Sequence, residues 1–97
     1  MTSKTYFTQY FDKISHHICS VESAKLKECA TQVRRANEFG NKIIIVGNGG
    51  SAAMASHVAV DFTKAAGIRA INFNEADLIT CFANDYGYEN WVVEALN

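Results

Sequence analysis

Apolar residues recur at helical spacing from Thr5 to Ile18. They form a single stripe made of Tyr6, Phe7, Tyr10, Phe11, Ile14 and Ile18. This spacing predicts an amphipathic helix, with Thr2 or Ser3 available as its N-cap. Because the stripe is heavily aromatic and a small domain has little interior, we interpret it as a subunit interface. The alternative is that the stripe packs on its own domain, since pattern alone does not separate the two.

A second helix is predicted before residue 40. Ser20 is its expected N-cap, and Gly40 stands where a glycine ends a helix. Its apolar positions are Val21, Ala24, Leu26, Cys29, Ala30, Val33 and Ala36. His16 and His17 lie near the end of the first helix. Adjacent helical positions point about 100° apart, so these two are interpreted as solvated histidines rather than as a ligand pair.

The pattern then changes to that of an α/β unit. The β-branched run Ile43–Val46 predicts a strand that stops at Gly47. After a glycine-rich turn, an alanine-rich stretch predicts a helix from about Ser51 to Ala66, with Gly67 as its stop. A second strand is predicted at Ile68–Phe73, and a right-handed crossover would place it parallel to the first.

The remaining residues predict turns and short helices. Asn74–Asp77 is expected to form a turn or a helix cap, followed by a short apolar helical turn. Asn84–Gly87 is expected to break that helix, because its residues favour tight turns. Glu89–Leu96 then starts another helix. Two parallel strands do not form a stable sheet alone, and an apolar pattern still runs at Asn97, so the expected fold class is the N-terminal part of a larger α/β domain.

Composition and charge narrow the function. The 97 residues, 48% hydrophobic and 20% charged, fit one small globular domain, and the net charge of −1 offers no basic face for nucleic acid or an acidic membrane. The longest apolar run, Ile43 to Gly47, is far too short to span a bilayer. Cys19, Cys29 and Cys81 show no CxxC spacing and are expected to be reduced, mostly buried thiols of a cytoplasmic protein.

The turn Gly47-Asn48-Gly49-Gly50-Ser51 is the first candidate site. Glycines let a ligand approach the main chain, Asn48 and Ser51 add side-chain hydrogen bonds, and the helix N-terminus favours anions. Ser51 is also placed to cap the helix. The turn matches neither the dinucleotide fingerprint nor the P-loop. It predicts a site for a small anionic or hydroxyl-rich ligand, with a simple tight turn as the alternative.

Two further groups of polar residues are candidates. His57 and Asp61 stand at i and i+4 and share one helix face. They are either an exposed pair or a partial metal site or acid–base pair directed toward the glycine turn, although two ligands are too few for zinc. Asn84 and Asp85 would follow the second strand at the same sheet edge and bind substrate hydroxyls, or else form a turn that caps the last helix.

Two blocks of sequence, GNGGSAAMASHVAVD and LITCFANDYGYE, closely resemble the sugar isomerase (SIS) domain in its phosphoheptose isomerase branch, also called sedoheptulose-7-phosphate isomerase. The resemblance covers Lys42 to Leu96. It implies a doubly wound, Rossmann-like parallel sheet preceded by two helices. Residues 1–40 would be a helical oligomerisation segment and residues 41–97 the first part of the core of a single SIS domain. It also implies a homotetramer whose N-terminal helices pack together.

The same resemblance implies roles for the candidate residues. The turn Asn48–Ser51, with Asn84 and Asp85, would bind the sugar phosphate. His57 would be a metal ligand, usually for Zn²⁺. Asp61 takes the position of a glutamate that is a metal ligand and the proton-transfer base. The implied reaction is isomerisation of ketose and aldose phosphates through an enediol.

The chain departs from the family pattern in two ways. Asp61 is one methylene shorter than the family glutamate, and a general base tolerates little misplacement. The serine- and threonine-rich phosphate loop and the C-terminal glutamine and histidine ligands have no counterpart and would follow Asn97. The chain is therefore expected to be an incomplete, inactive portion. The alternatives are a non-catalytic SIS module that binds a sugar phosphate or a protein partner, and an isomerase of another sugar phosphate.

Overall fold

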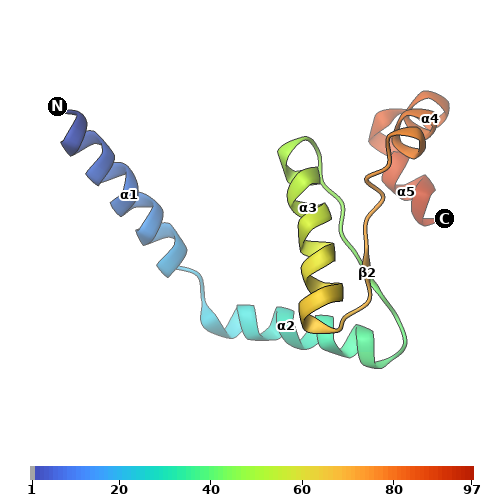
Figure 1. The fold of residues 1–97 in the computed structure, drawn as a ribbon, viewed down its shortest axis with the longest axis horizontal. Helices are drawn as coiled ribbons and strands as arrows, with labels where there is room; N and C mark the ends of the chain where they lie inside the picture. The colour runs from blue at the N-terminus through green and yellow to red at the C-terminus, as the bar shows by residue number, and fades with distance from the viewer. Residues whose placement is uncertain (1) are drawn as a thin grey trace. The chain divides into compact units, whose positions relative to one another are not determined.

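The computed structural model describes residues 2–97. The chain divides into two compact units, Met1–Gln32 and Val33–Asn97. Within residues 2–97 it combines five α-helices with a two-stranded parallel sheet, which is a partial α/β architecture (Figure 1). In chain order the elements are α1 (Ser3–Cys19), α2 (Ser23–Glu38), β1 (Ile43–Ile44), α3 (Gly50–Asp61), the π-helix η1 (Phe62–Ala66), β2 (Ala70–Ile71), α4 (Ala76–Tyr86), the 3₁₀-helix η2 (Tyr88–Asn90) and α5 (Trp91–Leu96).

The predicted first helix is confirmed in the N-terminal unit. Thr2 is its N-cap, because its side-chain oxygen accepts a hydrogen bond from the Thr5 N–H at 3.3 Å. The apolar stripe is exposed along its whole length, with rings that stack one turn apart: Tyr6 on Tyr10 at 6.4 Å and Phe7 on Phe11 at 6.5 Å. The six stripe residues are between 39% and 67% exposed.

Ser20 ends the first helix instead of starting the second. Its N–H donates to the carbonyl oxygen of His16, and its hydroxyl donates to that of His17 at 2.7 Å. Carbonyl groups in the last turn of a helix lack intrahelical partners, and Ser20 satisfies two of them, so the predicted N-cap role is wrong. The second helix begins three residues later, at Ser23.

Gly40 ends α2 as predicted. It adopts φ of 80°, and its N–H donates to the Asn37 carbonyl oxygen while the Asn41 N–H donates to that of Ala36. This pair of bonds is the Schellman arrangement, which favours glycine because of the left-handed backbone. The chain is thereby turned directly into β1.

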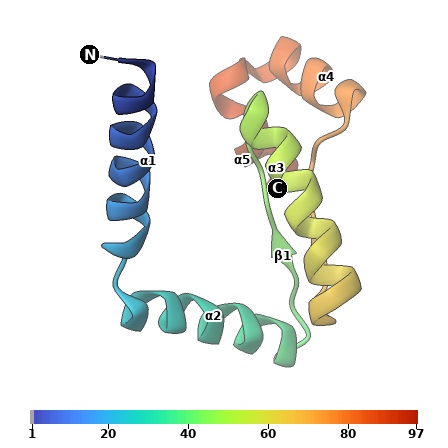
Figure 2. The same ribbon diagram turned by 60° about the vertical axis from the view of Figure 1, so that its left-hand side comes forward.

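The two strands pair in parallel, as predicted. Ile43 lies opposite Ala70 and Ile44 opposite Ile71. The paired segments are shorter than the predicted strands, although the bond from the Ile45 N–H to the Ile71 carbonyl oxygen continues the ladder at 2.9 Å. Parallel strands end at the same sheet edge, and both views place the first turn of α3 and α4 at that end of the unit (Figure 1, Figure 2).

The helix after the glycine turn differs from its prediction at both ends. Gly49, not Ser51, occupies the N-cap position, and no side chain caps the helix there. Gly49 adopts φ of 60° and ψ of −121°, a glycine conformation that brings the chain into the helix early enough to leave Ser51 in the first turn. The predicted stretch up to Ala66 is helical, but its last five residues form a π-helix that ends at Gly67, with φ of 65°.

The predicted break at Asn84–Gly87 is wrong for its first three residues. α4 runs from Ala76 to Tyr86, so Asn84 and Asp85 lie in its last turn. Only Gly87 leaves the helix, with φ of 88°, because a positive φ is accessible to glycine and costly for the residues before it. The predicted helix after residue 89 is confirmed by η2 and α5.

The buried core of residues 2–97 is small. Three side chains are buried: Ala55 and Ala59 on α3, and Trp91 at the start of α5. The cysteines are free, as expected, but all are exposed, so their predicted burial is wrong. An apolar pattern at helical spacing places a side chain on one face of its helix but does not determine whether another element covers that face. No helix in this part of the chain has the length and apolar character to cross a membrane.

Candidate functional site

The three glycines of the turn from β1 into α3, Gly47, Gly49 and Gly50, differ in their surroundings and backbone conformation. A Cβ atom on Gly47 would lie 2.4 Å from the backbone carbon and oxygen of Ser51, so this glycine permits close packing of the strand end on the helix. Gly49 supplies the positive φ that the turn needs. Around Gly50 there is open space for a Cβ atom. Gly49 is open in the same way, so a ligand can approach the backbone at both positions.

Asn48 joins this turn to the C-terminal segment of the chain. The hydroxyl of Tyr88 in η2 donates a hydrogen bond to Asn48 Oδ1, across 40 positions of sequence. The Asn48 backbone oxygen in turn accepts from the Ser51 N–H at 3.1 Å. The sequence block that contains Asn84 and Asp85 thus meets the glycine turn through Tyr88.

Asn84 and Asp85 lie one helical turn before that contact. The Asn84 side-chain amide donates to Asp85 Oδ1 at 3.3 Å, and Asp85 Oδ2 accepts from the Cys81 thiol at 3.8 Å. Among residues 2–97, no hydrogen bond or ion pair joins either residue to the glycine turn. Their link to it runs along the chain through Tyr88, so their predicted role as ligand groups stays a prediction.

The acidic residues of α4 change the chemistry of Cys81. The negative charge of Asp85 is the largest cause of a raised Cys81 pKa, followed by partial desolvation, the charge of Asp77 and the hydrogen bond to Asp85. A raised pKa lowers the fraction of nucleophilic thiolate at neutral pH. Cys81 is therefore a poor candidate for a nucleophile.

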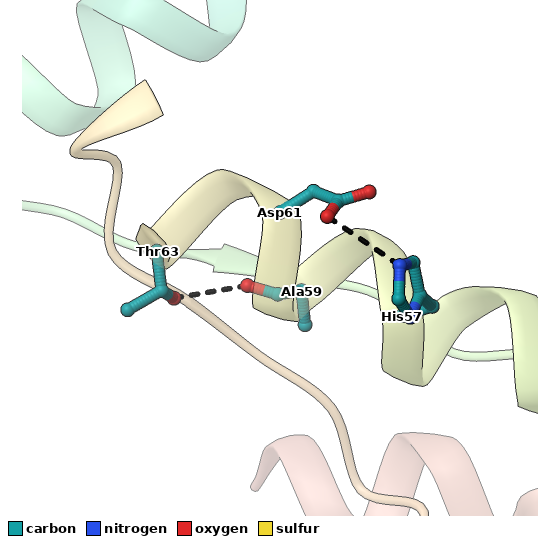
Figure 3. Close-up of polar contacts among 4 residues, drawn as sticks. All are labelled: His57, Ala59, Asp61 and Thr63. Atoms are coloured by element: carbon teal, nitrogen blue, oxygen red, sulfur yellow. Dashed lines mark hydrogen bonds and ion pairs between the residues drawn. The ribbon is translucent and has the colours of Figure 1, made fainter. Parts of the chain in front are cut away.

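His57 and Asp61 form an exposed pair on α3. Nε2 of His57 lies 3.5 Å from Oδ1 of Asp61, and the two side chains are 77% and 62% exposed (Figure 3). The buried Ala55 and Ala59 alternate with them at two-residue steps, about 200° around the helix axis. The pair therefore lies on the face of α3 opposite its buried face.

The pair does not by itself form a zinc site. An imidazole nitrogen and a carboxylate oxygen are suitable zinc donors, but zinc sites in proteins use at least three protein ligands. No group of three or more histidine, cysteine, aspartate and glutamate side chains within residues 2–97 is placed to hold a metal ion. Two donors on an exposed helix face do not fit the ion without others.

Other polar contacts brace the same end of the unit. The Asn74 side-chain amide donates to Ser56 Oγ at 2.8 Å and to the Ala52 carbonyl oxygen at 3.4 Å, which ties the loop after β2 to α3. At the other end of α3, the hydroxyl of Thr63 in η1 donates to the Ala59 carbonyl oxygen at 2.9 Å (Figure 3). A shallow, mainly apolar groove of about 320 Å³ lies between α3 and β2.

Tyr88 lies in the second family-like block of sequence but had no predicted role, and Asn74 was expected only to form a turn or a helix cap. Tyr88 was detectable as an aromatic residue directly after a glycine at a predicted ligand edge. Asn74 carried no signal beyond its turn propensity. Both make contacts across more than 15 positions, and periodicity reports only local structure.

Comparisons with known proteins relate the chain to one enzyme family. It is 39% identical over 71 residues to phosphoheptose isomerase 2 of Campylobacter jejuni, a match that covers 67% of this chain and 35% of that protein. It is 37% identical over 86 residues to a phosphoheptose isomerase of Fusobacterium nucleatum, covering 81% and 44%. With a phosphoheptose isomerase of Thermodesulfovibrio yellowstonii the identity is 41% over 69 residues, covering 65% and 34%.

The chain thus spans between about a third and somewhat under half of the length of these relatives. No family model matches the chain. No solved structure matches it either. The repeated matches confirm the resemblance that the glycine turn and the NDYGY segment indicated: the chain belongs to the phosphoheptose isomerase (SIS) family, of which it matches the N-terminal portion.

Proposed function

We propose that the chain is part of a phosphosugar isomerase of the phosphoheptose isomerase type, which interconverts ketose and aldose phosphates through an enediol. The observation that carries this proposal is the hydrogen bond from Tyr88 to Asn48, because it joins the two sequence blocks on which the family resemblance rests. The names of the relatives support the same reaction class. Since the chain spans under half of the length of those relatives, the proposed activity is that of a full-length protein of this type.

The proposed fold and assembly are those that the family resemblance implies, and surfaces that the chain leaves uncovered support them. The pair β1–β2 would be part of a doubly wound SIS sheet, since two parallel strands with three buried side chains need further layers. The exposed aromatic stripe of α1 would pack against copies of itself in a homotetramer. A net charge of −1 supports a protein that binds neither nucleic acid nor an acidic membrane, and the proposed location is the cytoplasm.

The proposed binding site is the glycine turn. Backbone N–H groups at the start of α3 carry the positive end of the helix dipole, which favours a phosphate or another anionic oxygen. Asn48 and Ser51 would add side-chain donors, while Gly49 and Gly50 would let the sugar phosphate reach the main chain. Asn84 and Asp85 would bind sugar hydroxyl groups from α4.

The proposed chemistry uses a carboxylate base. Asp61 would take the proton from the hydroxyl-bearing carbon next to the carbonyl, which gives an enediol, and would return it to the former carbonyl carbon. The proton of the hydroxyl group on the first carbon would move to the former carbonyl oxygen. The glycine turn lies at the other end of α3, about 16 Å along the helix from Asp61, so it would hold the phosphate, and other donors would stabilise the negative charge that develops on oxygen. His57, at 3.5 Å from Asp61, would orient the carboxylate. No step is assigned to zinc, because binding Zn²⁺ at this pair would need donors from outside the described residues.

Ligand binding to the 97-residue chain tests the proposed sugar-phosphate site at the glycine turn. Sedoheptulose 7-phosphate, added to ¹⁵N-labelled chain, is expected to shift the amide signals of residues 48–51 in a saturable way. Sedoheptulose without its phosphate serves as the matched ligand and is expected to bind more weakly, because it lacks the anion that the helix N-terminus favours. Absence of saturable shifts with the phosphate ester contradicts the proposed site.

Isotope exchange tests the proposed role of Asp61 as the base. In D₂O, formation of the enediol replaces the carbon-bound proton of the sugar with deuterium, which NMR detects at rates far below those of a turnover assay. We expect slow exchange that Asp61→Asn abolishes, and no measurable net isomerisation by the 97-residue chain. Net turnover by this chain contradicts its proposed inactivity.

A non-catalytic SIS module that binds a sugar phosphate or a protein partner is the second candidate. It is favoured by the exposure of the His57–Asp61 pair and by the absence of a third metal donor within residues 2–97. For such a module, Asp61→Asn leaves sugar-phosphate binding unchanged and no deuterium enters the sugar. Exchange that depends on Asp61 excludes it.

A further inference from the structure

Tyr88 holds the side chain of Asn48 from outside the glycine turn. The donor is the Tyr88 hydroxyl and the acceptor is Asn48 Oδ1. Both side chains lie at the surface, with Tyr88 50% exposed. The contact joins the loop that precedes α3 to the segment that follows α4, so it fixes two parts of the unit that no strand pairing connects.

The residues around Tyr88 restrict the position of its hydroxyl group. Gly87 adopts φ of 88°, a backbone conformation that other residues rarely adopt, so the turn before Tyr88 favours glycine. The Tyr88 ring contacts the ring of Trp91 at a centroid distance of 6.5 Å, and Trp91 is one of the buried side chains. The Asn90 side-chain amide also donates to the Tyr86 carbonyl oxygen at 2.9 Å, which ties η2 to the end of α4.

The contact with Tyr88 determines which end of the Asn48 side-chain amide is free to bind a ligand. An asparagine side chain has one acceptor oxygen and an NH₂ group with two donor hydrogens. With Oδ1 engaged by Tyr88, the NH₂ group lies on the opposite side of the amide carbon and has no protein acceptor among residues 2–97. The Asn48 backbone is held as well, through the bond from the Ser51 N–H.

We infer that Tyr88 is a positioning residue of the proposed sugar-phosphate site: it binds Asn48 Oδ1, so that the Asn48 NH₂ group donates to an oxygen of the ligand. This inference rests on the proposed function. The recognised chemistry is an oxygen acceptor, and its source is either the phosphate or a sugar oxygen. Preorganisation of this kind strengthens binding because the amide does not lose rotational freedom when the ligand arrives.

The first experiment needs no ligand. In ¹⁵N-labelled chain, Tyr88→Phe removes only the donor hydroxyl and is expected to shift the Asn48 side-chain NH₂ signals and raise their mobility in relaxation measurements. Tyr86→Phe is the matched control, because residues 2–97 offer the Tyr86 hydroxyl no hydrogen bond. The backbone amide spectrum reports whether each variant keeps the fold. Asn48 NH₂ signals that are the same in Tyr88→Phe as in the unmodified chain overturn the inference.

The second experiment uses ligands and a variant at the other end of the bond. Loss of the Tyr88 hydroxyl is expected to weaken sedoheptulose 7-phosphate binding about 2- to 10-fold, the range for one hydrogen bond. Asn48→Asp keeps the acceptor for Tyr88 but lacks the NH₂ donors, and we expect a loss of about 10-fold or more. Equal binding by Tyr88→Phe and the unmodified chain, or by Asn48→Asp and the unmodified chain, contradicts the inference.

Inorganic phosphate and unphosphorylated sedoheptulose separate the two sources of the acceptor oxygen. An uncharged variant is used here because the carboxylate of Asn48→Asp would repel phosphate in either case. If Asn48 donates to the phosphate, Asn48→Ala weakens inorganic phosphate binding and leaves sedoheptulose binding unchanged; if it donates to a sugar oxygen, the reverse holds. A chain that binds none of the three ligands contradicts the proposed function. The Asn48 NH₂ signals without ligand still show whether Tyr88 orients the Asn48 amide. Failure of the proposed function is therefore distinguishable from failure of the proposed role of Tyr88.

Discussion

Arg69 and the end of α2 are joined at Asn37 by two separate hydrogen bonds. A guanidinium N–H of Arg69 donates to the Asn37 carbonyl oxygen at 2.6 Å, and the Arg69 backbone N–H donates to Asn37 Oδ1 at 3.1 Å. The guanidinium also donates twice to the carbonyl oxygen of Asn41. A cation thus closes the negative end of the α2 dipole and fixes the entry to β2.

Replacing Arg69 by lysine is expected to destabilise the chain. Lysine keeps the charge but loses the planar fork that reaches both carbonyl oxygens, so we expect a decrease of about 1–2 kcal/mol in the free energy of unfolding. Arg34→Lys on α2 is the matched control and should change stability by less than about 0.5 kcal/mol. Urea unfolding followed by circular dichroism measures both. Equal midpoints for the two variants would mean that the Arg69 contacts are not stabilising.

Gly47 and Gly50 should respond differently to alanine. A methyl group on Gly47 would overlap the Ser51 backbone, which belongs to the helix and moves only with it. We expect Gly47→Ala to lower stability by about 2–3 kcal/mol. Gly50→Ala, with open space around it and a helical position, should be neutral or stabilising by up to about 1 kcal/mol. Thermal unfolding distinguishes them, and similar melting temperatures for both variants would refute the close packing at Gly47.

Cys81 should react slowly with alkylating reagents. Its raised pKa leaves less thiolate at a given pH, so the rate of iodoacetamide labelling rises with pH and reaches its midpoint above the ordinary value for a thiol. Asp85→Asn removes the largest cause of the shift, and the midpoint should then move down. Peptide mass spectrometry follows Cys81, with Cys19 in the same molecule as an internal reference. An unchanged Cys81 profile in Asp85→Asn would exclude the Asp85 charge as the cause.

The aromatic stripe of α1 should control self-association. The double change Phe7→Ser with Phe11→Ser removes two rings that are 53% and 60% exposed in the single chain. If copies bury them, each ring contributes about 2 kcal/mol, and the dissociation constant should rise by about 100-fold or more. Gln9→Ser with Lys13→Ser, at the same spacing off the stripe, is the control. Light scattering with size-exclusion chromatography gives the mass; oligomers that survive the phenylalanine changes argue against this interface.

Much of the local structure was predictable because its causes are local. The helical period of the stripe, the capping oxygen of Thr2 and the glycines at positions 40 and 67 each act within a few residues, and each has the predicted effect. The parallel pairing of the strands also followed, since a crossover helix between two β-branched runs leaves few other topologies. The errors arose where two local signals competed. Ser20 could cap either helix, and Asn84 fits both a turn and a helix end.

The candidate site was also predictable only where its causes are local. The sequence by itself determined the strand, the glycine turn, the helix that carries His57 and Asp61, and the family to which they point, because these depend on residue types at short spacing. Only the tertiary structure decided that Asn48 meets Tyr88, that Gly47 is needed for packing while Gly50 is open, and that the His57–Asp61 pair is exposed. Those facts depend on which surfaces the folded chain brings together, and contacts across 40 positions leave no periodic trace in a sequence.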